Sequence, residues 1–114
     1  MSPSTHDSDG TYMEIRSIEF TEHTKRRLKE REISTGIIME ALKSPDAIFW
    51  DVKDNHYVAV KYAEPGKGYM IAFDLEGSKL IVVTVFYSSK LGRTVESRKG
   101  KRWVEAKVQL RFEV

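Results

Sequence analysis

Three side chains that are able to do chemistry recur at four-residue intervals near the start of the chain: His23, Arg27 and Arg31. In an α-helix each step of four residues drifts by only about 40°, so all three share the half of the helix that faces a core. A partly buried guanidinium costs free energy unless it is paired. We therefore expect these arginines to have a partner, which is an acid such as Asp51 or Asp74, a backbone carbonyl, or an exogenous phosphate.

Two interpretations of this cluster stay open. In the first, the arginines lay their methylene groups on the core and reach water or an internal acid. In the second, the cluster is an anion site whose chemistry fits RNA cleavage without a metal. That reaction uses the RNA 2′-hydroxyl as nucleophile and requires a base, cations at the phosphate and an acid at the leaving oxygen. His23 fits the base or the acid, and Arg27 and Arg31 fit the phosphate.

Basic residues gather in the last part of the chain. From residue 90 to residue 114 there are eight Lys and Arg residues against three Glu residues, a net charge of +5 in a chain whose total is +2. A basic segment on a near-neutral domain suits contact with an anion such as RNA, and a solvated surface gives the same pattern. Tyr87, just before this segment, is either a catalytic and stacking ring or a core aromatic residue. The candidate phosphate contacts are Lys90, Arg93, Arg98, Lys101 and Arg102.

Composition excludes several classes of function. The 114 residues contain no cysteine, which excludes disulfides, a thiol nucleophile and cysteine-ligated metals. The three histidines have no ligand spacing, so we expect neither a metal nor a cofactor. No apolar run reaches the roughly 18–20 residues of a membrane span, and Met1–Tyr12 lacks the apolar stretch of a signal peptide. We expect a cytoplasmic protein in which residues 1–12 form a flexible tail and residues 13–114 form a single domain.

Two helices are predicted at the start of that domain. A short strand over Met13–Phe20 leads into a helix over Thr21–Arg31, whose first residue is the N-cap. Ser34 caps a second helix over Thr35–Lys43, which has one apolar face. Pro45 ends this helix, because proline disfavours helical geometry at the residue before it.

The hydrophobic period then changes to two, which predicts strands. Short turns and one loop rich in Pro and Gly separate them. The four strands are Ala47–Val52, His56–Ala63, Tyr69–Leu75 and Lys79–Tyr87. The last of them is apolar on both faces, as is typical of a central strand covered on both sides. A short helix is expected to follow over Ser89–Arg98.

The end of the chain predicts one more strand. From Val104 to Val114 apolar and polar residues alternate strictly, which indicates a half-buried strand. Its apolar face must pack on the open face of the sheet or against a second copy of the chain, which would make a homodimer. Together the elements predict an α+β fold in which two N-terminal helices pack on a four-stranded antiparallel sheet, with this extra C-terminal strand.

The first helix and the residues after it also resemble a known family. The chain is similar to the H-x-x-x-R-[ML]-x-x-R-G-I-S…AL…P pattern of a widespread, uncharacterised prokaryotic domain family, which is generally placed with the RelE/ParE/BrnT-like toxin fold. The resemblance covers roughly residues 18–90. It departs from the pattern at Glu32, where the family usually has a glycine that would end the helix. The matching residues are His23, Arg27, Leu28, Arg31, Ile33, Ser34, Ala41, Leu42 and Pro45.

This resemblance implies a RelE-like two-helix, four-strand fold and suggests an activity. Toxins of this group include messenger-RNA endoribonucleases, gyrase inhibitors and members without a known activity, and fold does not settle function. A toxin of this kind is usually neutralised by an antitoxin protein. We therefore carry two hypotheses: an RNA-binding protein or metal-independent endoribonuclease, and a non-catalytic protein- or nucleic-acid-binding module that dimerises through its C-terminal strand.

Overall fold

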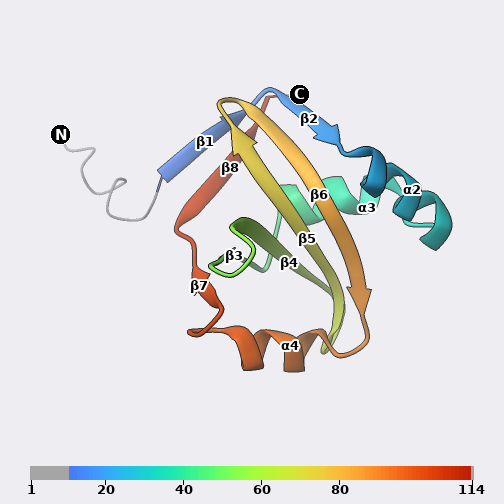
Figure 1. Ribbon diagram of the computed structural model, residues 1–114, viewed down its shortest axis with the longest axis vertical. Helices are drawn as coiled ribbons and strands as arrows, with labels where there is room; N and C mark the ends of the chain where they lie inside the picture. The colour runs from blue at the N-terminus through green and yellow to red at the C-terminus, as the bar shows by residue number, and fades with distance from the viewer. Residues whose placement is uncertain (1–10, 114) are drawn as a thin grey trace.

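The computed structural model describes residues 11–113, so most of the expected tail, residues 1–10, lies outside the described residues. Within that range the chain forms three helices and eight strands (Figure 1). The helices are α2 (Glu22–Arg31), α3 (Thr35–Lys43) and α4 (Leu91–Arg98). The strands are β1 (Thr11–Ile15), β2 (Ser17–Phe20), β3 (Ala47–Asp51), β4 (His56–Glu64), β5 (Lys67–Glu76), β6 (Lys79–Ser88), β7 (Trp103–Glu105) and β8 (Val108–Phe112).

The expected fold of two helices on a four-stranded antiparallel sheet is wrong, although the α+β class holds. The described residues form a six-stranded mixed sheet in the order β2-β6-β5-β4-β3-β7, and β1 pairs with β8 in a separate two-stranded sheet. The four predicted strands are its centre, β3 to β6, joined antiparallel. The additions are the short edge strands: β2 runs parallel to β6, and β7 runs antiparallel to β3.

The two predicted N-terminal helices are confirmed, and local capping explains where they begin. Thr21 is extended, and its hydroxyl accepts a hydrogen bond from the backbone nitrogen of Thr24 at 3.1 Å. Ser34 does the same for Ile37 at 3.3 Å. Side-chain oxygens at these positions satisfy backbone N–H groups that have no partner inside the helix. Glu32 ends α2 in the left-handed conformation, with φ of 54°, which a glycine would adopt without a side-chain penalty.

The alternating segment at the end of the chain is two strands rather than one. After β7 leaves the edge of β3, the backbone nitrogen of Ala106 donates to the carbonyl of Ile48 at 2.9 Å. The chain then continues as β8, which runs parallel to β1 over its whole length. The half-buried apolar residues of β8 pack against the core of the same chain. The apolar face of β8 was expected to pack on the sheet of the same chain or against a second copy. In the structure it packs on the core within the same chain.

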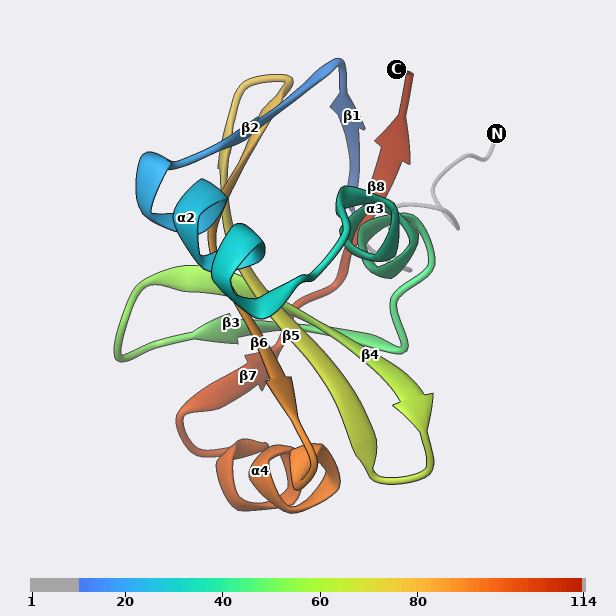
Figure 2. The ribbon, with the colours of Figure 1, turned by 90° about the vertical axis from the view of Figure 1, so that its right-hand side faces the viewer.

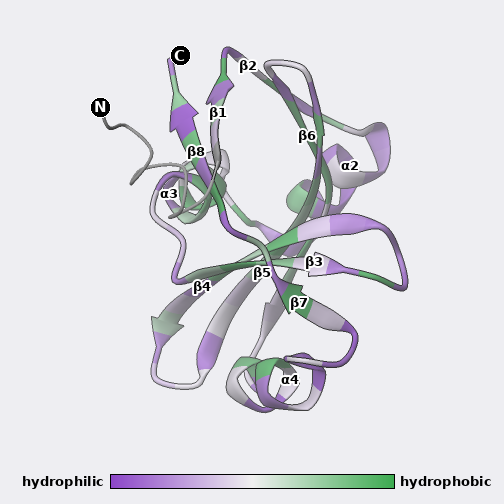
Figure 3. Ribbon diagram, turned by 90° about the vertical axis from the view of Figure 1, so that its left-hand side faces the viewer, coloured by the Kyte–Doolittle hydropathy of each residue, from purple (hydrophilic) through white to green (hydrophobic). Residues whose placement is uncertain are grey.

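Apolar side chains form a core on each face of the six-stranded sheet. Helices α2 and α3 and the β1–β8 pair cover one face, and α4 covers the other (Figure 2). Successive strand residues alternate between the two cores, as Ala59 and Val60 do in β4. Helix α2 is mainly hydrophilic (Figure 3), and its buried residues are Thr24 and Leu28. It therefore covers the sheet with a narrow stripe, which leaves most of its charged residues in solvent.

Candidate functional site

Helix α2 lies along an open edge of β6. Strand β2 pairs with β6 only as far as Val82, so the second half of β6 has no strand on that side within the described residues. Polar side chains of the helix take its place: the Thr24 hydroxyl lies 2.6 Å from the carbonyl oxygen of Val83, to which it donates a hydrogen bond. The guanidinium of Arg31 donates to the carbonyl of Val85 at 3.3 Å. These contacts satisfy edge carbonyls that would otherwise face a helix without a partner.

A bulge in β6 helps to present those carbonyls. Ala72 of β5 faces Thr84, but the next residue along β5, Phe73, faces Val82, so Val83 has no partner in β5. An extra residue of this kind bends the strand and increases its twist. The Thr24 side chain consequently contacts two successive carbonyls, those of Val82 and Val83.

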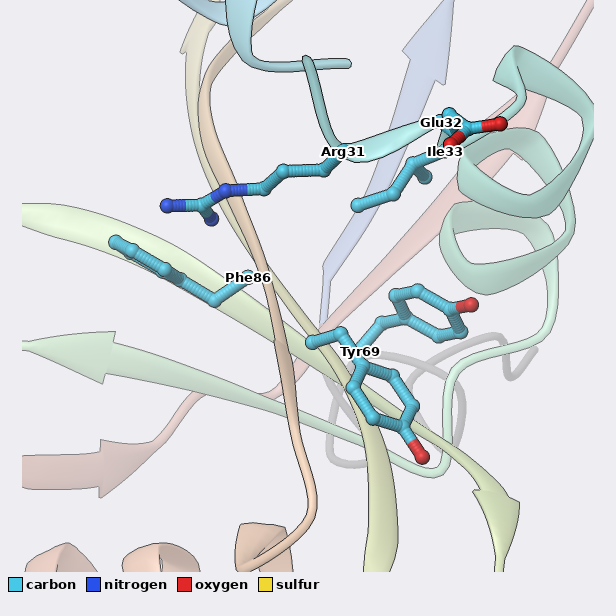
Figure 4. A pocket seen from close by; sticks show the side chains of 6 residues that line it. Arg31, Glu32, Ile33, Tyr69 and Phe86 are labelled. Atoms are coloured by element: carbon cyan, nitrogen blue, oxygen red, sulfur yellow. The ribbon is translucent and has the colours of Figure 1, made fainter. Parts of the chain in front are cut away.

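Arg31 lies at a cavity beside this edge (Figure 4). Its guanidinium carbon lies 5.4 Å from the centre of the Phe86 ring, which is the geometry of a cation–π contact. The cavity has a volume of about 520 Å³, within the roughly 300–1,000 Å³ that small-molecule sites usually span. In Figure 4 the Glu32 side chain points away from Arg31, toward α3. The residues that line the cavity are Arg31, Glu32, Ile33, Tyr69, Phe86 and Tyr87.

Tyr87 reaches the same cavity from the end of β6. Its ring packs edge-on against Tyr69 of β5, with 5.2 Å between ring centres, because the two residues face each other across the ladder. Tyr87 is 45% exposed and Phe86 is 41% exposed. Two predicted site residues that are far apart in the sequence, Arg31 and Tyr87, thus meet at one cavity.

The other two residues of the predicted cluster are not at this cavity. His23 is exposed and Arg27 is half-buried, and neither lines it. His23 precedes Arg31 by eight residues, which places it about 12 Å away along the helix axis. Within residues 11–113 no hydrogen bond or ion pair joins Arg27 to an acid, and Arg31 bonds to a carbonyl, one of the three kinds of partner expected from the sequence.

The two acids expected as partners have other roles. Asp74 bonds to His56, with 2.7 Å between its oxygen and Nδ1 of the ring. Asp51 is buried and accepts from the Nε atom of Arg102 at 2.9 Å and from the indole nitrogen of Trp103 at 3.1 Å. Two backbone N–H groups of the following turn also donate to it. Burial alone would raise the pKa of Asp51, but these hydrogen bonds, the one from Arg102 first, hold that pKa well below its ordinary range.

The predicted phosphate contacts divide into two groups. Arg102 is committed to Asp51 and also donates to Asp54 at 2.7 Å, and the bond to Asp51 raises its pKa. The Arg98 guanidinium lies 5.2 Å from the Trp103 ring, so Arg98 packs on the α4 side of the sheet. A separate group remains near the cavity: Lys90 and Arg93 line a second hollow at the start of α4 together with Gly66, Ser89 and Gly92. Lys101 is exposed and lines neither hollow.

The second hollow lies next to the first along the sheet. Tyr69 and Tyr87 face each other at the cavity, and the next pair of the β5–β6 ladder is Gly68 and Ser88, after which Ser89 lines the second hollow. Gly68 is required here because a Cβ would lie 2.1 Å from the backbone oxygen of Lys61. The arrangement brings Arg31, an aromatic cluster and two further basic residues together at one end of the sheet.

The sequence did not single out Tyr69 or Phe86. Tyr69 begins a predicted strand and looks like any half-buried strand aromatic residue. Phe86 belongs to a strand whose apolar pattern indicated cover on both sides, but the structure leaves it 41% exposed. A regular antiparallel hairpin with its turn at Gly77 would place Tyr69 opposite Phe86, and the bulge at Val83 moves its partner to Tyr87, so the sequence offered no local signal for this pair.

Two further properties of the described residues bear on the kind of site. No group of three or more His, Cys, Asp or Glu residues within residues 11–113 is arranged to hold a metal ion. None of the helices in that range has both the length and the apolar character required to cross a membrane.

The fold and the cavity define an α+β domain with a basic and aromatic site at the open edge of a mixed sheet. The chain belongs to the family described as a domain of unknown function (DUF4258), whose sequence profile matches residues 20–89. All six residues that line the Arg31 cavity lie inside the matched range, whereas Lys90 and the rest of the basic segment follow it. Comparisons with curated proteins and with solved structures found no match.

Proposed function

We propose that this protein binds RNA, and that Arg31 contacts a phosphate at the cavity beside β6. The observation that carries the proposal is the meeting of Arg31 and Tyr87 at one cavity. One guanidinium nitrogen of Arg31 is held by the Val85 carbonyl, which orients the group while its other donors remain for an anion. The resemblance of the α2 motif to the RelE/ParE/BrnT-like toxins supports a nucleic-acid ligand, and an antitoxin as protein partner is part of the same proposal.

Charge around the cavity supports a path for the RNA backbone. Lys90 and Arg93 line the neighbouring hollow, one ladder pair beyond the cavity. Lys90 follows Val85, whose carbonyl holds Arg31, by five residues, so the Cα atoms of Lys90 and Val85 lie within about 17 Å of each other. A strand of a few nucleotides can therefore contact all three cations. Arg102 is not part of this surface because two aspartates neutralise it.

The geometry supports binding rather than cleavage by the predicted His23 mechanism. A general base has to lie within hydrogen-bond reach of the proton that it removes. His23 lies outside the cavity, about two helical turns from Arg31. We therefore assign no catalytic role to His23.

The test measures binding of a fluorescently labelled RNA 12-mer by anisotropy at fixed salt concentration. Arg31→Gln is expected to weaken binding about tenfold, the effect of losing one charge-assisted contact. Arg26→Gln is the matched control: Arg26 is exposed on the same helix and does not line the Arg31 cavity, so binding should change less than twofold. No binding by the unaltered protein, or equal losses in the two variants, would contradict the proposal.

The same samples, resolved on a denaturing gel, report cleavage. We expect intact RNA. If the unaltered protein cleaves the RNA and His23→Ala does not, the reaction depends on His23. That result would overturn the assignment of a protein that binds RNA and gives His23 no catalytic role.

A further inference from the structure

The cavity presents aromatic rings that are open to solvent, which phosphate binding alone does not require. Phe86 and Tyr87 are 41% and 45% exposed. Each ring is fixed on one side, Phe86 by the Arg31 guanidinium and Tyr87 by the edge-on contact with Tyr69. Fixed aromatic rings with a free surface are stacking platforms for flat ligands, and they lose little conformational freedom when a ligand binds.

The cavity also lies over the edge of the sheet rather than over one face. Phe86 and Tyr87 are successive residues of β6, so their side chains point to opposite faces, and yet both line this cavity. Only a space at the strand edge contacts both. The edge is open here because no strand within the described residues pairs with that side of β6 beyond Val82.

The backbone of this edge offers hydrogen bonds as well. Val85 turns its carbonyl toward α2 and away from β5, since it accepts from Arg31. Two residues further on, Tyr87 turns its own N–H and C=O to the same open side, because a strand repeats every two residues. A flat ligand at the rings therefore meets one backbone donor and one backbone acceptor in addition to the Arg31 cation.

A nucleobase with its phosphate has this combination of properties: a flat ring, donors and acceptors on its edge, and a negative charge beside it. Resting on the proposed RNA-binding function, we propose that the cavity holds one unpaired nucleotide of single-stranded RNA. Its base stacks on the exposed ring of Tyr87, and its phosphate contacts Arg31 beside the Phe86 ring. The backbone continues toward Lys90 and Arg93. Duplex RNA is excluded, because its bases are already stacked and their edges are already paired.

The experiment compares single-stranded RNA with a duplex of the same sequence, in the same anisotropy assay. We expect the duplex to bind at least tenfold more weakly. Tyr87→Ala should weaken single-strand binding about tenfold, the usual effect of losing one stacked base, whereas Tyr87→Phe keeps the ring and should change binding less than twofold.

Tyr12→Ala is the matched control for a lost aromatic residue. Tyr12 is 46% exposed and has an arginine over its ring, since the Arg111 guanidinium lies 4.4 Å from the ring centre. It belongs to β1, away from the cavity, so its loss should change RNA binding less than twofold. A loss equal to that of Tyr87→Ala would overturn the inference.

One measurement needs no variant and therefore does not depend on the folding of Tyr87→Ala. A single strand of ribose and phosphate without bases keeps the charge of RNA and removes stacking. The unaltered protein should bind it at least tenfold more weakly than the complete strand. Equal affinity for the two strands would overturn the inference.

The outcomes separate this inference from the function on which it rests. If single-stranded and duplex RNA bind equally and Arg31→Gln weakens both, the RNA-binding function stands and the stacked nucleotide is wrong. If neither binds, both proposals fail. Light scattering could instead show a dimer that Tyr87→Ala dissociates while RNA affinity stays the same. The rings would then contact a second copy of the chain, and the inference would be overturned.

Discussion

Two arginines in this chain show how environment decides what a guanidinium does. Arg102 lies between Asp51 and Asp54 and bonds to both carboxylates, and its neighbour Trp103 bonds to Asp51 as well. Arg31 bonds to one carbonyl, of Val85, and lies beside a cavity. The first is neutralised by its carboxylate partners, whereas the second forms no ion pair within residues 11–113 and is the phosphate contact of the proposed function. Both arginines were candidate phosphate contacts in the sequence. Residue type does not distinguish their roles, whereas their positions in the fold do.

The largest expected effect on stability comes from removing the carboxylate that neutralises Arg102. Asp51→Asn removes the charge that Arg102 and the Trp103 indole contact, and it leaves a partly buried cation without its main partner. We expect the free energy of unfolding to fall by about 3 kcal/mol. Urea denaturation measures it, and Asp54→Asn is the control, with an expected loss below about 1 kcal/mol because the Asp54 side chain is 54% exposed. Equal losses in the two variants would show that Asp51 is not the centre of this cluster.

Acid should weaken the same cluster. The folded-state pKa of Asp51 lies below its unfolded value of about 3.9, so its contribution to stability is complete above that pH and is lost as the pH falls through the folded pKa. The stability difference between the unaltered protein and Asp51→Asn should therefore be largest near neutral pH and shrink below about pH 4. Urea titrations at a series of pH values measure this difference. A constant difference down to pH 2 would contradict the assignment.

A substitution at Thr24 should have a smaller effect on the free energy of unfolding. It tests the contact between α2 and the open edge of β6. Its buried hydroxyl contacts the carbonyls of Val82 and Val83, so Thr24→Val keeps the shape and removes those hydrogen bonds. We expect a loss of about 1–2 kcal/mol in the free energy of unfolding, because buried carbonyls lose a partner. Thermal or urea unfolding measures it. No loss would mean that the open edge of β6 does not depend on α2 for its hydrogen bonds.

Arg31→Gln should have the smallest effect on stability. Its bond to Val85 is single and the residue is exposed, so we expect a change below about 1 kcal/mol alongside the tenfold loss of RNA affinity. Arg102→Gln should instead destabilise the fold and leave RNA affinity unchanged in the fraction that stays folded. Unfolding and RNA-binding anisotropy measured on both variants test whether Arg31→Gln mainly affects affinity and Arg102→Gln mainly affects stability. The comparison fails if Arg31→Gln is the more destabilising of the two.

Local signals predicted the helices and the central strands well. Thr21, Ser34 and Pro45 act within one helical turn of the boundaries that they set, so they can be interpreted without knowledge of the fold. The hairpins between β4, β5 and β6 are likewise encoded by nearby turn residues such as Gly66 and Gly77, which both have positive φ.

The pairings that sequence analysis missed depend on residues that are far apart. The parallel contacts of β1 with β8 and of β2 with β6 leave no local mark, because no turn joins the strands. The break between β7 and β8 at Ala106 and Lys107 is hidden for a related reason. Strict alternation continues across it, although the two strands pair with different partners.

The candidate site was predicted in part, for the same reason. Arg31 was identified through the spacing of its helix, and Tyr87 through its place before a basic segment. That they share a cavity follows from the early end of β2, which leaves an edge for α2 to cover. His23 was grouped with Arg31 because helical drift is small per turn, but over two turns the separation along the axis removes it from the cavity.

The parallel pairing of β1 with β8 has a consequence for synthesis. Ile15, fully buried, lies opposite Phe112, so the earliest described strand is completed by the last one. On the ribosome β1 must wait, with its apolar side uncovered, until β8 has left the exit tunnel. Contacts that close so much of the chain are slow to form, which makes this interval the period when a nascent copy is most exposed to aggregation and to chaperones.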